Sequence, residues 1–124
     1  MKSEMSDFYD DLKKAREKCP WANTQTLLNH IHELEKEIEE VKLAIKNNDD
    51  KNLKEELGDV FMDALFLLVI AEEKGIDSGE VVKMVNEKLV RRKPWVFGDA
   101  KVNSKEEAIK MWNEIKKKEK YNKN

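Results

Sequence analysis

The sequence predicts an all-α protein, because its composition and its hydrophobic spacing both favour helices. Charged residues make up 40% of the chain and aromatic residues 7%, with only four glycines and two prolines among 124 residues. Such a composition is typical of long solvated helices rather than short strands joined by tight turns. In several long stretches, apolar residues recur every three or four positions, which is the period of an amphipathic helix. The length fits one domain, so we expect residues 1–124 to form a single helical domain.

The N-terminal half is expected to form three helices. The first covers residues 3–18 and ends there because Pro20 pushes the residue before it out of the helical region. The second covers residues 24–46, and the turn formers at 47–50 separate it from a third that extends to Gly75. The apolar stripe of the second helix consists of Leu27, Ile31, Leu34, Ile38, Val41 and Ile45. We therefore expect the second and third helices to form a central antiparallel hairpin.

Two more helices are expected in the C-terminal half. One covers residues 78–92 and stops before Pro94, and the segment that follows it, "KPWVFGDAKVN", is expected to be a long loop. Ser104 and Glu107 fit a capping box that opens the last helix. The lysine-rich end, residues 121–124, is expected to fray. We expect Trp21, Trp95 and Phe97 to be packing residues that close loops over the core.

Composition also excludes several classes of protein. The net charge is only −2, which selects neither nucleic acid nor an anionic membrane as a partner. The longest apolar run, residues 64–71, is much shorter than the ~20 residues that cross a bilayer. Cys19 has no cysteine partner, and the N-terminus lacks the apolar core of a secretion signal, so we expect a cytoplasmic protein.

Acidic residues form one row on each helix of the predicted hairpin. In an antiparallel pair both rows lie at a similar distance from the turn, so four to six carboxylates converge. They are Glu37, Glu40, Glu56 and Asp59, with Glu33 and Asp63 beside them. No equal row of lysines faces these oxygen ligands, which favours a hard divalent cation, Mg²⁺ or Mn²⁺. The alternative is an ordinary solvated face, since acids spaced by three or four residues are common on charged helices.

Several short motifs occur in a fixed order along the chain. They are "CPW" at residues 19–21, Gln25 with Thr26, "EEVKLAI", "EELGDVF", "KLVRRKPWVFGD", and Trp112 with Lys116. In this order they resemble the MazG-type nucleoside triphosphate pyrophosphohydrolases of the all-α NTP pyrophosphatase superfamily. The likeness runs over residues 19–120. It implies an all-α enzyme that assembles as a homodimer or a dimer of dimers, and the apolar surface at residues 65–70 is a candidate subunit interface.

The resemblance also implies a metal site. The family motif is E-E-x-x-E followed after a spacer by E-x-x-D, and its first acid is replaced here by Lys36. The remaining acids are implied to be catalytic Mg²⁺ ligands, namely Glu37, Glu40, Glu56 and Asp59. Because Lys36 is not an acid, the identity of the general base stays open, with Glu33 and Asp63 as candidates.

The implied reaction is cleavage of a nucleoside triphosphate between its α and β phosphates, which yields a monophosphate and pyrophosphate. Lys88, Arg91 and Arg92 lie within little more than one helical turn and are candidates to hold the phosphates. Trp112 is a candidate to stack on the base and Lys116 to meet a phosphate. Without the resemblance, these residues would be interpreted as an ordinary basic helix face and a core tryptophan.

Two other functions are compatible with the sequence. One is a non-enzymatic helical interaction module whose charged faces dock a partner, and the other is an RNA-binding role for the lysine-rich end, which lacks supporting aromatic residues. Mg²⁺-dependent release of pyrophosphate separates the enzyme from both. His30 and His32 lie on opposite sides of their helix and cannot chelate one metal, so no chemistry is assigned to them. The preferred base and sugar are not determined.

Overall fold

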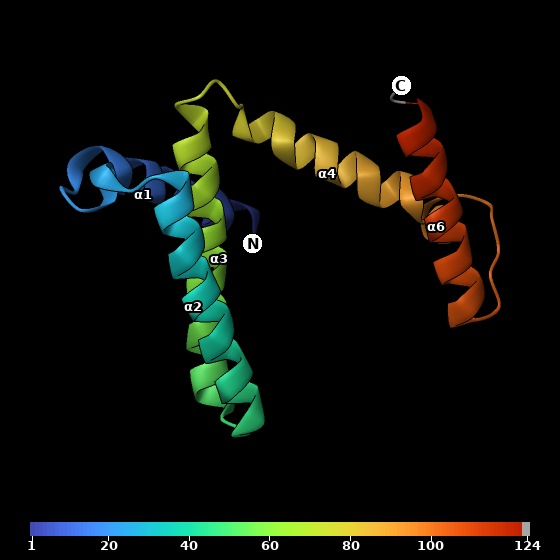
Figure 1. Cartoon of the computed structure of the whole chain (residues 1–124), viewed down its shortest axis with the longest axis horizontal. Coiled ribbons are helices and arrows are strands. Elements are labelled where there is room, and N and C mark those ends of the chain that lie inside the picture. Colours follow the sequence, from blue (N-terminus) through green and yellow to red (C-terminus); the bar gives the residue numbers. More distant parts are fainter. Residues whose placement is uncertain (123–124) are drawn as a thin grey trace. The chain divides into compact units, whose positions relative to one another are not determined.

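A computed structural model describes residues 1–122, and every regular element in that part of the chain is helical (Figure 1). The helices are α1 (Lys2–Lys18), α2 (Leu27–Lys46), α3 (Asp50–Glu72), α4 (Ser78–Arg92), α5 (Pro94–Phe97) and α6 (Lys105–Asn122), with a 3-10 turn at Ala22–Thr24. The all-α prediction is confirmed. No helix among residues 1–122 is both long enough and apolar enough to span a bilayer.

The chain divides into two compact units, which are described separately. The N-terminal unit comprises residues 1–78 and holds α1, α2 and α3. The C-terminal unit begins at residue 79 and holds α4, α5 and α6. That the whole chain forms a single domain stays a prediction.

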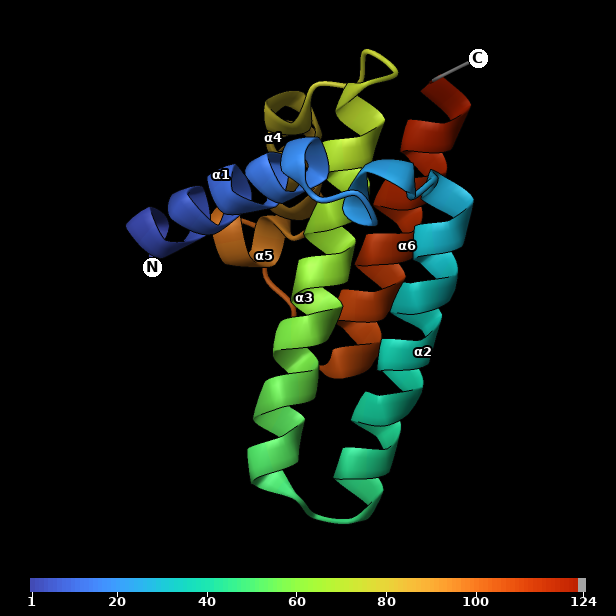
Figure 2. The same cartoon turned by 90° about the vertical axis from the view of Figure 1, so that its left-hand side faces the viewer.

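The N-terminal unit is built on the hairpin of α2 and α3, which run antiparallel along each other (Figure 2). The Thr26 hydroxyl accepts a hydrogen bond from the Asn29 amide at 3.1 Å, and this cap starts α2. The Asp49 carboxylate caps α3 in the same way, by accepting from the Asn52 amide at 3.2 Å. Between the helices Asn48 takes a φ of 51°, a left-handed conformation that asparagine tolerates better than most residues. The predicted hairpin is confirmed.

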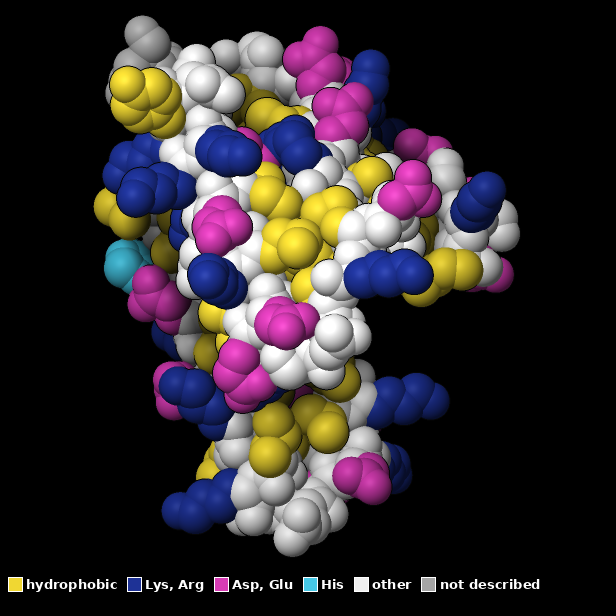
Figure 3. Space-filling model, turned by 90° about the vertical axis from the view of Figure 1, so that its right-hand side faces the viewer, with side chains coloured by type: hydrophobic (Ala, Val, Ile, Leu, Met, Phe, Trp, Pro, Cys, Tyr) yellow, Lys and Arg dark blue, Asp and Glu magenta, His cyan; other side chains and the backbone are white. Residues whose placement is uncertain are grey.

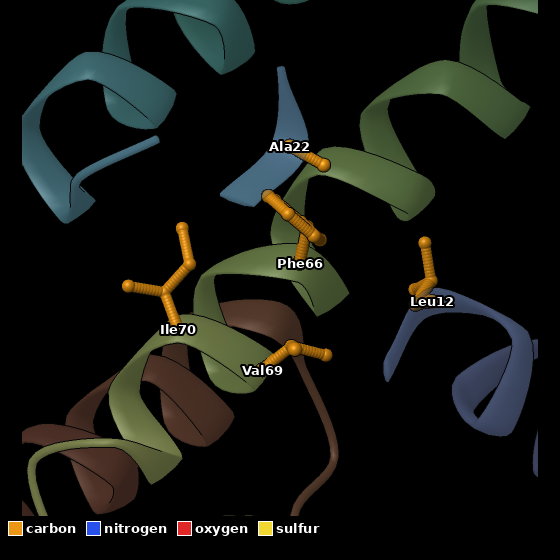
Figure 4. Packing of buried hydrophobic residues seen from close by; sticks show 5 residues of the cluster. All are labelled: Leu12, Ala22, Phe66, Val69 and Ile70. Atoms are coloured by element: carbon orange, nitrogen blue, oxygen red, sulfur yellow. The ribbon is translucent and has the colours of Figure 1, made fainter. Parts of the chain in front are cut away.

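Helix α1 packs against α3 and closes the core of this unit. Figure 4 shows its buried side chains, which are Leu12, Ala22, Phe66, Val69 and Ile70. Arg16 stabilises the segment that connects α1 to α2, because its Nη1 donates to the backbone carbonyls of Ala22 at 2.6 Å and Gln25 at 2.7 Å. The same guanidinium pairs with Glu73 at the end of α3, with Nε 2.8 Å from Oε2. These bonds hold the 3-10 turn over the hairpin.

Burial on α3 differs from the sequence-based expectation. Phe66, Val69 and Ile70 belong to the apolar segment expected to face another subunit, yet they are buried within the N-terminal unit, because α1 and the 3-10 turn cover them. The large apolar side chains that stay exposed lie earlier on α3, at Leu57, Phe61 and Met62. Hydrophobic side chains are also uncovered between charged ones on the face seen in Figure 3. Homo-oligomer formation stays a prediction.

Two of the expected packing aromatics are not buried. Trp21 is 57% exposed, so it does not close its loop over the core as expected. Phe97 is also exposed, whereas Trp95 is half-buried. Pro20 ends α1 as predicted, but the turn that follows it packs through Ala22 instead of through the indole.

The C-terminal unit follows its predicted helices with one addition. α4 ends at Arg92, before Pro94, as predicted. The segment expected to be a loop begins with the four-residue helix α5, because proline at the first helical position already has the required φ. The amide of Glu107 donates to the Ser104 hydroxyl at 3.1 Å, which confirms Ser104 as the helix cap. The Glu107 carboxylate accepts from the amide of Asn103 at 2.7 Å, one residue before the amide it would meet in a full capping box.

The expected frayed tail is only partly described. Tyr121 and Asn122 are helical, as the last residues of α6. Residues 123 and 124 lie outside the described part of the chain.

Candidate metal centre

Three of the predicted metal ligands meet between the helices of the hairpin. Glu37 projects from α2, and Glu56 and Asp59 project from α3, where a spacing of three residues places them on one face. One carboxylate oxygen of each lies within 4.8 Å of the other two, and all three residues are half-buried. We call Glu37, Glu56 and Asp59 the acidic cluster. The antiparallel pairing predicts that four to six carboxylates converge, and three of them meet here.

The acidic cluster carries an electrostatic cost that its own residues do not relieve. A hydrogen bond with Glu56, then burial, and the charges of Asp59, Glu56 and Asp63 raise the pKa of Glu37 to about 7. Oε2 of Glu56 is buried and has no hydrogen-bond partner within residues 1–122. Like charges at this separation disfavour full ionisation without a counterion, so without a cation Glu37 keeps its proton up to a pH of about 7.

The cluster fits a hard divalent cation. Its ligand atoms are carboxylate oxygens, which suit Mg²⁺ and Mn²⁺, and no cysteine or histidine belongs to the group. A cation would supply the partner that Oε2 of Glu56 lacks. Glu37, Glu56 and Asp59 are therefore the residues that would hold the metal.

Glu40, the fourth predicted ligand, lies outside this group. It is one turn further along α2 than Glu37, and its side chain is exposed. Among the described residues, the group of three whose ligand oxygens all lie within 4.8 Å of one another consists of the other three acids. A role for Glu40 in metal binding stays a prediction.

A cavity of about 380 Å³ adjoins the acidic cluster inside the N-terminal unit. Its apolar lining comes from α1, the 3-10 turn and α3, and includes Leu12, Trp21 and Phe66. Its acidic wall consists of Glu33, Glu37, Asp59 and Asp63, and His30 also lines it. Both candidates for the general base thus lie on the wall that carries two residues of the acidic cluster.

His30 is a residue of this cavity that sequence reasoning missed. It is 3% exposed, its Nε2 lies 3.1 Å from Oδ1 of Asp63, and its ring meets the Phe66 ring edge-on with 4.6 Å between centroids. The contact with Asp63 has the distance of a hydrogen bond but not its alignment. The sequence did contain a signal, because His30 is three residues after Leu27 and four before Leu34, on the apolar side of α2.

In the C-terminal unit, the predicted phosphate-binding arginines contact an acid. The guanidinium groups of Arg91 and Arg92 both pair with Glu119 on α6, with Nη2 of Arg92 2.9 Å from Oε1. Hydrogen bonds from Arg91 and then Arg92 lower the pKa of Glu119 to about 2. Arg92 also lies over the Trp112 ring, 5.2 Å from its centroid. Nζ of Lys93 also lies over this ring, 5.9 Å from its centroid, so a nucleobase would have to stack where neither cation covers the indole.

The two predicted lysines are not part of that group of contacts. Lys88 is half-buried on α4, and Lys116 is exposed on α6, one turn after Trp112. Both are in the C-terminal unit, together with Arg91, Arg92 and Trp112. The substrate-binding roles of all five stay predictions.

Comparison with known proteins decides the family. Residues 25–97, more than half of the chain, match the model of the MazG nucleotide pyrophosphohydrolase domain. The chain belongs to this family. The MazG match includes the whole acidic cluster and the basic end of α4, whereas Trp112 and Lys116 lie beyond it.

Named MazG relatives and a solved MazG-related structure agree with this result. A Thermotoga maritima protein named nucleoside triphosphate pyrophosphohydrolase/pyrophosphatase MazG is 40% identical over 108 residues, which are 86% of this chain and 41% of that protein. The Escherichia coli K12 nucleoside triphosphate pyrophosphohydrolase is 33% identical over 102 residues, 82% of this chain and 39% of its own length. The chain thus spans less than half the length of these curated relatives.

The structural comparison extends over nearly the whole of both chains. The crystal structure of a MazG-related protein from Thermotoga maritima has a TM-score of 0.82 and 41% sequence identity, and the match covers 90% of this chain and 98% of that one. The resemblance inferred from the ordered motifs is therefore confirmed.

The raised pKa of Glu37 would make cation binding to the acidic cluster of this MazG domain dependent on pH. Its pKa in the folded protein is about 7, above the ordinary value of 4.5, so without metal the stability falls as pH rises through that window. A bound cation would remove the repulsion between the carboxylates but would have to displace the proton of Glu37. We expect millimolar Mg²⁺ to raise the melting temperature more at about pH 8 than at about pH 6. Calorimetry measures the difference, and equal shifts at both pH values would contradict it.

The exposed acid Glu35 provides a matched control for this measurement. It lies on α2 like Glu37, but its carboxylate faces His32, 3.8 Å away, outside the acidic cluster. Glu35→Gln should retain the pH-dependent Mg²⁺ response, and Glu37→Gln should lose most of it.

Proposed function

We propose that the chain is a Mg²⁺-dependent nucleoside triphosphate pyrophosphohydrolase, with Mn²⁺ as a possible substitute. It would cleave ribo- or deoxynucleoside triphosphates between the α and β phosphates and so remove unwanted nucleotides from the cellular pool. The observation that carries the proposal is the acidic cluster, which lies on the hairpin within the segment that matches the MazG family. The names of the Thermotoga maritima and Escherichia coli relatives support the reaction class.

The residues of the acidic cluster suit phosphoryl transfer to water. Glu37, Glu56 and Asp59 project from facing helices, so they would bind the cation without a large rearrangement of the backbone. When bound, Mg²⁺ neutralises phosphate charge and lowers the pKa of water. In the reaction a water oxygen bonds to the α-phosphorus, the bond from that phosphorus to the bridging oxygen breaks, and pyrophosphate leaves. The water proton passes to a carboxylate, and no covalent intermediate is needed.

We further propose that the basic residues of α4 and α6 bind the phosphates and that Trp112 binds the base. Arg91 and Arg92 can offer bidentate contacts to phosphate, but they would have to give up part of their pairing with Glu119. The stacking of Arg92 on Trp112 fixes both side chains before a ligand arrives. Lys88 and Lys116 add positive charge on the same two helices.

Loss of the indole should weaken nucleotide binding. If Trp112 stacks on the base, Trp112→Ala should raise KM by the equivalent of ~1 to 3 kcal/mol, with a smaller change in kcat. Lys116→Ala should weaken triphosphate binding more than monophosphate binding. Tyr121→Ala is the matched control, because this aromatic side chain of α6 is 82% exposed. Steady-state kinetics measure the effect, circular dichroism checks folding, and an unchanged KM for Trp112→Ala would rule out stacking.

The products of hydrolysis test the proposed function. We expect the protein with Mg²⁺ to convert at least one triphosphate of a panel of ribo- and deoxynucleotides into monophosphate and pyrophosphate, as followed by phosphorus NMR. Release of orthophosphate would indicate β–γ cleavage and contradict the proposal. No turnover of any member would favour the alternative of a non-enzymatic helical interaction module. The panel also reveals the preferred base and sugar.

A further inference from the structure

We propose that Asp63 accepts the proton of the attacking water and that His30 is the residue that positions Asp63. Asp63 lies one turn after Asp59 on α3 and lines the cavity beside the acidic cluster. The inference rests on the proposed function, because it assigns a role in that reaction. It goes beyond the family motif, in which neither residue has a place.

The structure favours Asp63 over Glu33, the other candidate for the general base. The acidic wall of the cavity has four members, and two of them, Glu37 and Asp59, belong to the acidic cluster. Of the remaining two, Glu33 has a 39% exposed side chain that pairs with Nζ of Lys36 at 3.3 Å. The Asp63 side chain is 12% exposed and contacts His30 instead of a lysine. Asp63 is therefore the acid beside the cluster that is shielded from solvent.

His30 is fixed in a way that suits a positioning residue. Its ring packs edge-on against Phe66, inside the core of the N-terminal unit, and its side chain is only 4% exposed. Nε2 lies 3.1 Å from Oδ1 of Asp63, and within residues 1–122 neither ring nitrogen has an aligned hydrogen-bond partner. Burying an imidazole without an aligned hydrogen-bond partner costs stability, and a role in positioning Asp63, the buried acid beside it, would account for its presence there.

The surroundings also make Asp63 a better proton acceptor than an exposed aspartate. In the metal-free protein its pKa is raised: burial is the largest cause, the charge and contact of His30 lower the pKa, and the charges of Asp59 and Glu33 raise it again. Burial, unlike the charge of Asp59, still acts when a cation is bound. A carboxylate whose pKa is closer to neutrality takes a proton from water more readily. Nε2 of His30 lies beside one oxygen of Asp63, Oδ1, so the proton can go to the other oxygen.

The step balances in atoms and charge. The water oxygen forms a bond to the α-phosphorus, its proton passes to Asp63, and the electron pair of the broken phosphorus–oxygen bond leaves with pyrophosphate. Solvent later removes the proton from Asp63. His30 exchanges no proton in this step.

Kinetic constants test the two roles. Asp63→Asn should lower kcat by about 10²- to 10⁴-fold, the range for general base catalysis, with little change in KM. His30→Leu should lower kcat in the same direction, and His30→Gln should restore part of it, because the amide can place a donor near the position of Nε2. The Mg²⁺-induced rise in melting temperature should be retained in Asp63→Asn. If Asp63 had only a structural role, its substitution would not lower kcat while leaving KM and the Mg²⁺-induced rise in melting temperature nearly unchanged.

His32 and Glu35 form the matched control pair. They are a histidine and an acid on the same helix, 3.8 Å apart but exposed, so His32→Leu and Glu35→Gln should retain wild-type kcat. Imidazole ¹⁵N NMR of the metal-free protein gives a readout that needs no turnover. The Nε2 resonance of His30 should shift in Asp63→Asn, whereas the resonances of His32 should not.

The possible outcomes separate this inference from the proposed function. A folded Asp63→Asn protein with wild-type kcat, or a greater loss of kcat in Glu33→Gln than in Asp63→Asn, overturns the inference alone. A wild-type protein that releases no pyrophosphate from any triphosphate overturns the proposed function and the inference with it. An unshifted His30 resonance in Asp63→Asn contradicts the positioning role of His30.

Discussion

Asp59→Asn should reduce the rate of pyrophosphate release by orders of magnitude while the helices stay folded. The substitution keeps the size of the side chain but removes one charged ligand from the acidic cluster, where carboxylate oxygens of three residues lie within 4.8 Å of one another. The folded protein should not be destabilised, because Asp59 sits among like charges and its loss relieves the repulsion on Glu37. The effect should appear chiefly in kcat.

Asp10→Asn is the matched control for this prediction. Asp10 is exposed on α1 and lies outside the acidic cluster, so its loss should leave kcat unchanged. Steady-state kinetics at saturating Mg²⁺ measure the difference, with circular dichroism as the check on folding. Full pyrophosphohydrolase activity in a folded Asp59→Asn protein would defeat the proposed metal site.

Phe66→Ala should have the largest effect on stability. The Phe66 side chain is 4% exposed in the core between α1, α3 and the 3-10 turn, and its ring also supports His30. Truncating a buried phenylalanine typically costs about 3 to 5 kcal/mol of folding free energy, because it leaves a cavity that neighbours fill only in part. We expect the melting temperature to fall by about 10 °C or more.

Phe61→Ala provides the comparison on the same helix. Phe61 is 41% exposed and stacks on Phe8 with 5.8 Å between ring centroids, so its truncation should cost much less. Urea unfolding of both variants gives the two free energies. A loss for Phe66→Ala no larger than that for Phe61→Ala would mean that the core does not depend on α1 packing over α3.

The hairpin and the acidic cluster were predictable because both follow from local periodicity. Helical spacing fixes the side of α2 on which Glu37 lies and the side of α3 on which Glu56 and Asp59 lie, and a short turn forces the helices to run antiparallel. Helical spacing alone could not show whether Glu40 belongs to the acidic cluster. Whether an acid one turn further along reaches the cluster depends on the spacing between the helices, which periodicity does not contain.

The other differences come from contacts between residues distant in sequence. The pairing of Arg91 and Arg92 with Glu119 spans 28 and 27 residues, so no helical repeat indicates it. The burial of Phe66 and Ile70 depends on α1, whose polar sequence gives little sign that Leu12 reaches them. His30 looked like a helix residue without chemistry, because its partner Asp63 lies on another helix.

A crystal of this protein grown with Mn²⁺ tests the central claim most directly, because manganese can be located by its anomalous scattering. The account predicts an anomalous peak bounded by the carboxylates of Glu37, Glu56 and Asp59, and no such peak in a crystal of the Asp59→Asn variant grown in the same way. A Mn²⁺ peak at a different place on the chain, together with Mn²⁺-dependent pyrophosphate release by the same preparation, would contradict it.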